Sequence, residues 1–206
     1  MKTLFTRKRD WIVALLLVWS LTGCSVVPEP TADLTRFYVL SNPRANGENV
    51  ALRSNALQIG LKRVEVSPYL DKGSLVVRHG DNELVYNDYA RWAEPIGAGV
   101  SRIVRSRLLD NQKIGRVFVD SFPFDQSRDY DISIYVTRCE GALNTGETRF
   151  AAVVEVTTTG ENARVVARRE FIAPSQAWNG KNYAALVAGL SEAVDALSNQ
   201  IVALLP

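Results

Sequence analysis

Residues 130–139 read YDISIYVTRC, and this stretch decides the fold because its apolar and polar side chains alternate. Side chains of a strand point to opposite faces with a period of two, so Ile132, Ile134 and Val136 share one face. Residues 150–159 repeat the pattern, with one face made of Phe150, Ala152, Val154 and Val156. Each strand therefore offers an apolar face to a layer of helices.

Further strand candidates lie on both sides of this pair. Residues 164–172 follow it across the turn Thr159-Gly160-Glu161-Asn162, and the earlier candidates are 36–40, 57–66, 75–78, 83–86 and 117–119. Within 57–66 the alternation changes phase at Lys62-Arg63, which predicts a β-bulge. The sequence His79-Gly80-Asp81-Asn82 predicts the turn of a hairpin.

Two helices are expected to cover the sheet. The first begins after Pro95, ends near Asp110-Asn111, and has an apolar stripe of Ile96, Val100, Ile103, Val104 and Leu108. The second covers 181–204 and has a near-heptad stripe of Tyr183, Val187, Leu190, Val194, Leu197, Ile201 and Leu204. Few charges flank this stripe, which favours packing onto the domain's own sheet; a seam for self-association is the alternative.

These elements predict one α+β domain over residues 36–206, with a mixed, mostly antiparallel β-sheet packed against two main α-helices. No internal repeat or change of composition divides this length. The 183 residues that follow residue 23 suffice for one sizeable core.

The first 23 residues have the form of a cleaved lipoprotein signal peptide. Basic residues precede an apolar core, Trp11 to Leu21, whose eleven residues are about half of the roughly twenty that span a bilayer as a helix. Leu21-Thr22-Gly23-Cys24 then resembles the bacterial lipobox. The resemblance implies a covalent diacylglycerol and an N-acyl chain on Cys24, and the alternative is an ordinary secretory signal with a chance cysteine.

Residues 24–35 are expected to be the lipidated N-terminus and a tether that Pro28 and Pro30 keep extended. An Asp after the cysteine resembles an inner-membrane retention signal, so Ser25 favours the outer membrane, with the domain facing the periplasm. The residues before Cys24 carry four of the 24 basic and one of the 22 acidic side chains, which leaves 20 and 21. Because no basic block remains, nucleic acid is not an expected partner.

No catalytic residue, metal site or further cofactor is predicted, so the chain is not expected to be an enzyme. The single histidine, His79, lies in the predicted turn, and Cys139 ends an apolar run that predicts a buried thiol. Zinc needs three or four closely spaced ligands, which these two residues cannot supply. A cluster of carboxylates around Phe122-Pro123-Phe124 leaves a cell-envelope hydrolase as a rival, although turn-forming roles are favoured for Asp120, Asp125, Asp129 and Asp131.

Three stretches carry a family resemblance: VEVSPYLDK at 64–72, LVVR at 75–78 and RWAEP at 91–95. In this order, ahead of an amphipathic helix, they resemble the ABC-type transport auxiliary lipoprotein family. The resemblance implies a non-enzymatic accessory of an MCE-protein system that moves phospholipids or other hydrophobic molecules between membranes and supports membrane integrity. The implied partner is the periplasm-spanning MCE-domain protein and, through it, a permease and an ATPase.

The resemblance makes Tyr69, Leu70, Arg91 and Trp92 the candidates for partner binding, because exposed Trp, Tyr and Arg carry much of the energy of typical interfaces. Their structural alternatives are a loop that covers the core edge and a Trp that staples the first turn of the helix. A periplasmic lipid-binding carrier is the other functional alternative, and it would need a continuous apolar pocket between sheet and helices. The sequence leaves open the transported molecule, its direction and the formation of a homo-oligomer.

Overall fold

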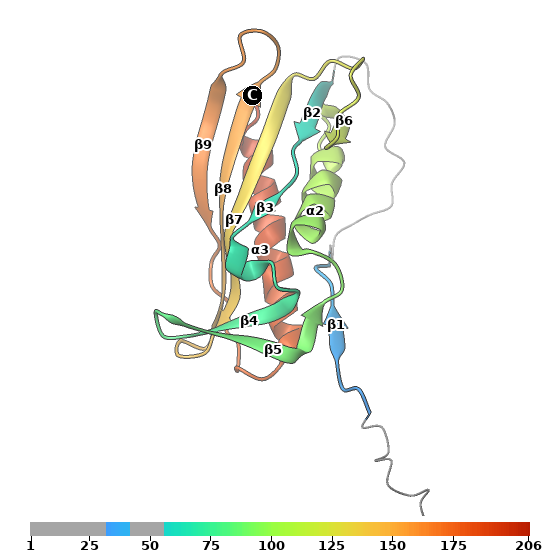
Figure 1. Ribbon diagram of the computed structural model, residues 1–206. Coiled ribbons are helices and arrows are strands. Elements are labelled where there is room, and N and C mark those ends of the chain that lie inside the picture. The colour runs from blue at the N-terminus through green and yellow to red at the C-terminus, as the bar shows by residue number, and fades with distance from the viewer. Residues whose placement is uncertain (1–31, 42–55) are drawn as a thin grey trace, which may run out of the picture. The chain divides into compact units, whose positions relative to one another are not determined.

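A computed structural model describes residues 32–41 and 56–206, which form a nine-stranded sheet with two α-helices (Figure 1). The strands are β1 (Arg36–Tyr38), β2 (Leu57–Leu61), β3 (Glu65–Val66), β4 (Ser74–His79), β5 (Glu83–Trp92), β6 (Ile114–Val119), β7 (Tyr130–Ala142), β8 (Glu147–Thr158) and β9 (Val165–Ile172). The helices are α2 (Ile96–Asp110) and α3 (Tyr183–Leu204), with a short 3-10 helix, η2 (Pro68–Leu70).

Strand β7 organises the sheet because it pairs along both of its edges. On one edge it runs antiparallel to β8 over 12 residue pairs, and β8 continues into β9. On the other edge it runs parallel to β2, then β3, then β4, over three, two and two pairs. Strand β6 extends the sheet beyond β2, while β5 and β1 extend it beyond β4.

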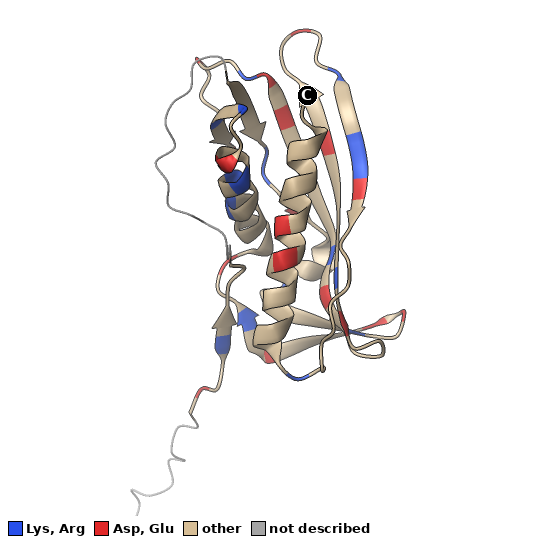
Figure 2. Cartoon of the chain, turned by 180° about the vertical axis from the view of Figure 1, so that it is seen from behind, with Lys and Arg blue, Asp and Glu red and all other residues tan. Residues whose placement is uncertain are grey.

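Both helices lie against one face of this sheet (Figure 1). The hydrophobic core fills the space between the helices and the sheet. Ile132, Ile134 and Val136 of β7 are buried, as the alternation predicts. The near-heptad stripe of α3 also lies in this core, since its buried members include Val187, Leu190, Val194, Leu197 and Ile201. Figure 2 shows that the charges of α3 are confined to the middle of the helix, where Asp195 Oδ1 accepts from Arg107 Nε of α2 at 2.5 Å.

The predicted α+β class is confirmed: the sheet is mixed, antiparallel pairs carry most of its paired residues, and two helices cover it. The hairpin is confirmed as well, with Gly80 in its turn at φ +64°. Cys139 is a buried free cysteine, and burial raises the pKa of its thiol to about 12. Among the described residues, no helix combines the length and apolarity needed to cross a bilayer.

The segment 57–66 differs from its prediction. It forms two short strands, β2 and β3, rather than one strand with a bulge. The interruption has a packing cause, because the N-terminal turn of α2 presses against the chain there. A Cβ atom on Gly97 would lie 2.7 Å from the carbonyl oxygen of Val64, so only glycine allows this approach without a shift.

Candidate functional site

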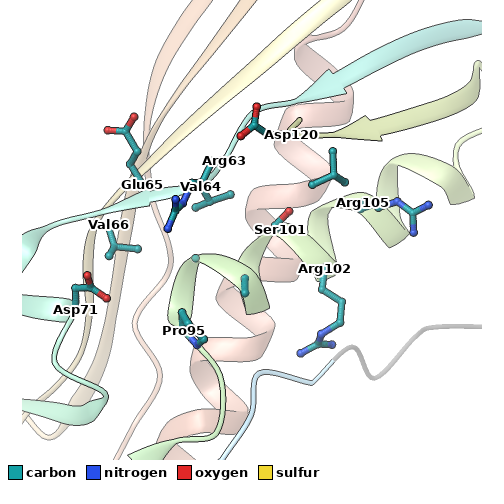
Figure 3. Close-up of a pocket in the computed structure, with 13 residues that line it drawn as sticks. Arg63, Val64, Glu65, Val66, Asp71, Pro95, Ser101, Arg102, Arg105 and Asp120 are labelled. Atoms are coloured by element: carbon teal, nitrogen blue, oxygen red, sulfur yellow. The ribbon is translucent and has the colours of Figure 1, made fainter. Parts of the chain in front are cut away.

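A groove of about 840 Å³ lies where β2 gives way to β3, with α2 as its opposite wall (Figure 3). One wall is the chain 63–66, and the other is the solvent side of the first half of α2. The lining is completed by residues of η2, β6 and the helix start, and consists of Arg63, Val64, Glu65, Val66, Asp71, Pro95, Gly97, Ala98, Ser101, Arg102, Arg105, Val119 and Asp120. Its size suits a short segment of a bound molecule.

Two of the three stretches that carry the family resemblance, 64–72 and 91–95, meet at this groove, while 75–78 does not line it. The first contributes Val64, Glu65, Val66 and Asp71 to the lining, and the second contributes Pro95. An adjoining cavity of about 220 Å³ shares Asp71 and Pro95 with the groove and is lined by both stretches as well. Two segments that lie about 20 residues apart in the sequence therefore build one local structure.

The four predicted partner-binding residues occupy different environments. Leu70 is 1% exposed and Trp92 is 7% exposed, and both line the smaller cavity. Tyr69 is half-buried and faces β7, where its hydroxyl donates to the carbonyl oxygen of Thr137 at 3.0 Å. Arg91 is partly exposed and pairs with Phe37 of β1. The structure therefore brings Leu70 and Trp92 together and leaves Tyr69 and Arg91 apart from them.

Trp92 has one unusual feature. Its indole Nε1 is buried and has no hydrogen-bond partner among residues 32–41 and 56–206. A buried donor without an acceptor is destabilising, so such a group in a native fold calls for a partner beyond the residues that the structure describes.

A buried polar cluster holds η2 in place behind the groove. The carboxylate of Glu140 is 1% exposed and accepts from Arg78 Nε at 2.5 Å and from the Tyr69 hydroxyl at 3.0 Å. Burial, and then the negative charge of Glu140, raise the pKa of Tyr69 far above its usual range. The hydrogen bond to Glu140 also raises the pKa of Arg78. This cluster fixes η2 on β4 and β7, and so it positions Leu70 and Asp71 at the two hollows.

Both walls of the groove carry charged side chains, and Arg63 and Glu65 lie on the same wall. Figure 3 shows Glu65 and Asp71 on the β3 and η2 side, and Arg102 and Arg105 on α2. Arg102 is held by Glu94 Oε1 at 2.5 Å and by the carbonyl oxygen of Leu40 at 2.8 Å.

Arg63 and Arg105 make no ion pair with any residue that the structure describes. The groove therefore offers two unneutralised guanidinium groups beside apolar side chains, a combination that suits binding. Sequence reasoning did not identify these two residues. The available signal was the face of α2 opposite its apolar stripe, which combines the small residues Gly97, Ala98 and Ser101 with arginines.

Two of the four clustered carboxylates, Asp129 before β7 and Asp131 at its start, are engaged in contacts within this region. Asp131 Oδ1 accepts from Arg128 Nε at 2.8 Å, and Asp129 Oδ2 accepts from the backbone nitrogen of Gln58 at 2.7 Å. Arg128 also stacks over the ring of Phe122, 4.1 Å from its centroid. Among the described residues, no group of three or more His, Cys, Asp or Glu side chains could hold a metal ion. These contacts favour the turn-forming reading of the cluster.

Comparisons with known proteins agree with the resemblance. No curated protein matches the chain at a significant level. A crystal structure described only as an uncharacterized protein has a TM-score of 0.63 at 18% identity, and the match covers 81% of this chain and 95% of that one. A Xanthomonas campestris protein of the DUF330 family has a TM-score of 0.62 at 21% identity, with 81% and 92% covered. At these identities the likeness shows the fold alone.

The family model for the ABC-type transport auxiliary lipoprotein component matches residues 38–202, which include all of α2, most of α3 and every strand after β1. This match spans most of the chain, including the two stretches that meet at the groove. The chain therefore belongs to the ABC-type transport auxiliary lipoprotein component family.

Proposed function

We propose that this chain is the outer-membrane-anchored accessory lipoprotein of an MCE-protein transport system, with its domain in the periplasm. Within its family, the stretches at 64–72 and 91–95 are similar to the paraquat-inducible protein C lipoprotein. In this role the chain docks the periplasm-spanning MCE-domain protein, supports transport of phospholipids or other hydrophobic molecules, and has no enzymatic step of its own. The observation that carries the proposal is the convergence of the two family stretches on one groove.

The lipid anchor is the first part of this proposal. Cys24 lies outside the described residues, and its acylation is inferred from the lipobox resemblance and from membership of a lipoprotein family. Ten residues lie between Cys24 and Thr35, a length that spans roughly 18 Å on average by random-coil scaling. The partner must therefore approach the membrane surface to meet the domain. We expect Cys24→Ala to leave a folded domain in the wrong place, and full function of that variant would contradict the anchor's role.

The groove is the second part. Arg63 and Arg105 are the side chains best suited to meet acidic residues of the partner, because neither has an ion pair within the described structure. Complementary charges speed encounter and select the partner. Leu70 and Trp92 are buried and line the adjoining cavity, so they support the shape of this region rather than face the partner. Truncation of Trp92 would remove a core side chain, so it would not test partner contact alone.

The test reverses the groove charges and measures capture of the MCE-domain protein. We expect the Arg63→Glu, Arg105→Glu double variant to bind that partner about tenfold more weakly, which corresponds to roughly 1.4 kcal/mol. The matched control is Arg168→Glu on β9, whose side chain is 71% exposed and which lies across the sheet from the groove. Equal capture by the double variant and the control, with both folded, would refute docking through the groove.

A further inference from the structure

Exposed apolar side chains gather where the chain enters the domain. Phe37 is 65% exposed, Val39 48% and Tyr89 61%. β1 runs parallel to the end of β5, with Phe37 opposite Arg91. Because Ala90 and Trp92 are buried in the core, the alternation of the strand places Tyr89 on the outward side, diagonal to Phe37. We call Phe37, Val39 and Tyr89 the entry patch.

The entry patch includes apolar side chains on the face of β1 that the rest of the domain does not cover. Leu40 is buried and Tyr38 packs against the core, so their side of the segment is already used. The intervening Phe37 and Val39 are nonetheless apolar, and β1 is an edge strand. A strand with apolar side chains on both sides is typical of one that is covered on both. Exposed apolar clusters of this kind mark a contact surface.

The position of the patch indicates what covers it. Figure 1 shows β1 at one end of the domain, while the β6–β7 loop and the β8–β9 turn lie at the opposite end. Phe37 follows Cys24 by thirteen residues, a length that spans roughly 20 Å on average by random-coil scaling, so acyl chains on Cys24 would hold the patch near the membrane surface. Aromatic side chains such as Phe and Tyr are favoured at the boundary between headgroups and acyl chains.

We propose that the entry patch rests on the lipid surface of the membrane that carries Cys24, as a second membrane contact beside the acyl chains. This proposal depends on the lipid anchor of the proposed function but not on docking of an MCE-domain protein. The diacylglycerol and the N-acyl chain would already attach the protein stably, and insertion of apolar side chains would add a contact of the domain itself. The contact would orient the domain, so that the β6–β7 loop points away from the membrane.

The charges near the patch predict how this contact responds to salt. Figure 2 shows basic positions on β1 and at the end of β5, which are Arg36 and Arg91. Asp88 of β5 lies three residues before Arg91 and offsets part of this positive charge. Net attraction to anionic lipids is therefore small, and burial of the apolar side chains drives the contact. We expect it to change little between roughly 50 and 500 mM salt, where an electrostatic contact would be screened.

The experiment measures lipid contact at single labelled positions of the full lipidated chain. Nanodiscs of phosphatidylethanolamine and phosphatidylglycerol hold one copy each, which excludes cover by a second copy. Phe37→Cys and Tyr89→Cys each receive an environment-sensitive fluorophore, and spin-labelled lipid serves as quencher. Cys139 stays unlabelled because it is buried, with a thiol pKa of about 12. The matched control is Phe124→Cys, a fully exposed aromatic position in the β6–β7 loop at the opposite end.

We expect quenching at positions 37 and 89 to be at least about twofold stronger than at position 124, at low and high salt alike. Quenching that is equal at all three positions, or strongest at 124, would overturn the proposal. Mass spectrometry of the same sample shows whether Cys24 carries its acyl chains. Lipidated protein with unquenched labels refutes the patch alone, while a chain without acyl groups refutes the anchor on which the proposal depends.

Discussion

The two edges of β7 are built differently. Along one edge, β8 pairs without a gap over 12 residue pairs, apart from one register shift near Thr137. Along the other edge, β2, β3 and β4 pair over three, two and two residues, with breaks between them. The groove and the family stretch 64–72 lie on the broken edge. The comparison teaches that the continuous edge supplies a stable frame, while the breaks on the other edge make room for the groove.

The largest expected effect comes from damage to the layer that both edges share. Ile134→Ala in β7 removes a side chain that is 2% exposed, and it should lower the free energy of unfolding by about 3 kcal/mol. Tyr135→Ala is the control on the next residue, because Tyr135 lies on the open face and is 39% exposed. It should cost about 1 kcal/mol or less. Urea unfolding of the two variants checks the difference, and similar losses would contradict a core placed on one face only.

A smaller effect is expected from the buried cluster behind the groove. Glu140→Gln keeps the shape of the side chain but leaves the guanidinium of Arg78 without its counterion, at a cost of about 2 kcal/mol. Glu155→Gln on β8 is the matched control, because its contact with Arg168 is 3.9 Å long and exposed. It should cost less than about 0.5 kcal/mol. Thermal unfolding measures both, and equal effects would show that the broken edge does not depend on this cluster.

The smallest predicted effect appears only in alkali. The folded state raises the pKa of Tyr69, so the unfolded chain loses this proton first, near pH 10. Stability from this group is therefore complete below about pH 10 and is lost as the pH rises further. We expect Tyr69→Phe to show a shallower alkaline decline in unfolding free energy than the unaltered chain. Parallel curves for the two proteins between about pH 9 and 11 would contradict a buried Tyr69 hydroxyl.

Much of the fold follows from local periodicity. The alternation in 130–139 and 150–159 predicts two neighbouring strands, and the apolar stripe after Pro95 predicts α2. Such patterns are local, so they predict an element correctly whenever one of its faces is buried. The sequence pattern does not predict the end of β7, because Glu140 and Gly141 are poor strand formers in isolation. In the folded chain, Arg78 neutralises the charge of Glu140. Gly141 is required because a Cβ atom at this position would lie only 2.4 Å from the ring of Trp178.

The groove could not be predicted from the periodicity of the sequence. The break between β2 and β3 arises from contact with Gly97, which lies more than 30 residues further along the chain. The sequence likewise does not distinguish which residues of the family stretches are exposed and which are buried. Leu70 and Trp92 resemble interface anchors in the sequence, yet they line a cavity from the core, while the unremarked Arg63 and Arg105 face the groove. Side-chain direction at a strand break is set by tertiary packing.

The most direct test of the groove as docking surface is photocrosslinking in intact cells. A photoreactive amino acid replaces Arg105 in the groove or, in a second strain, Arg168 on β9 along the continuous edge. Docking on the broken edge predicts an adduct between position 105 and the MCE-domain protein, and none from position 168. An adduct from position 168 with none from position 105 would contradict it.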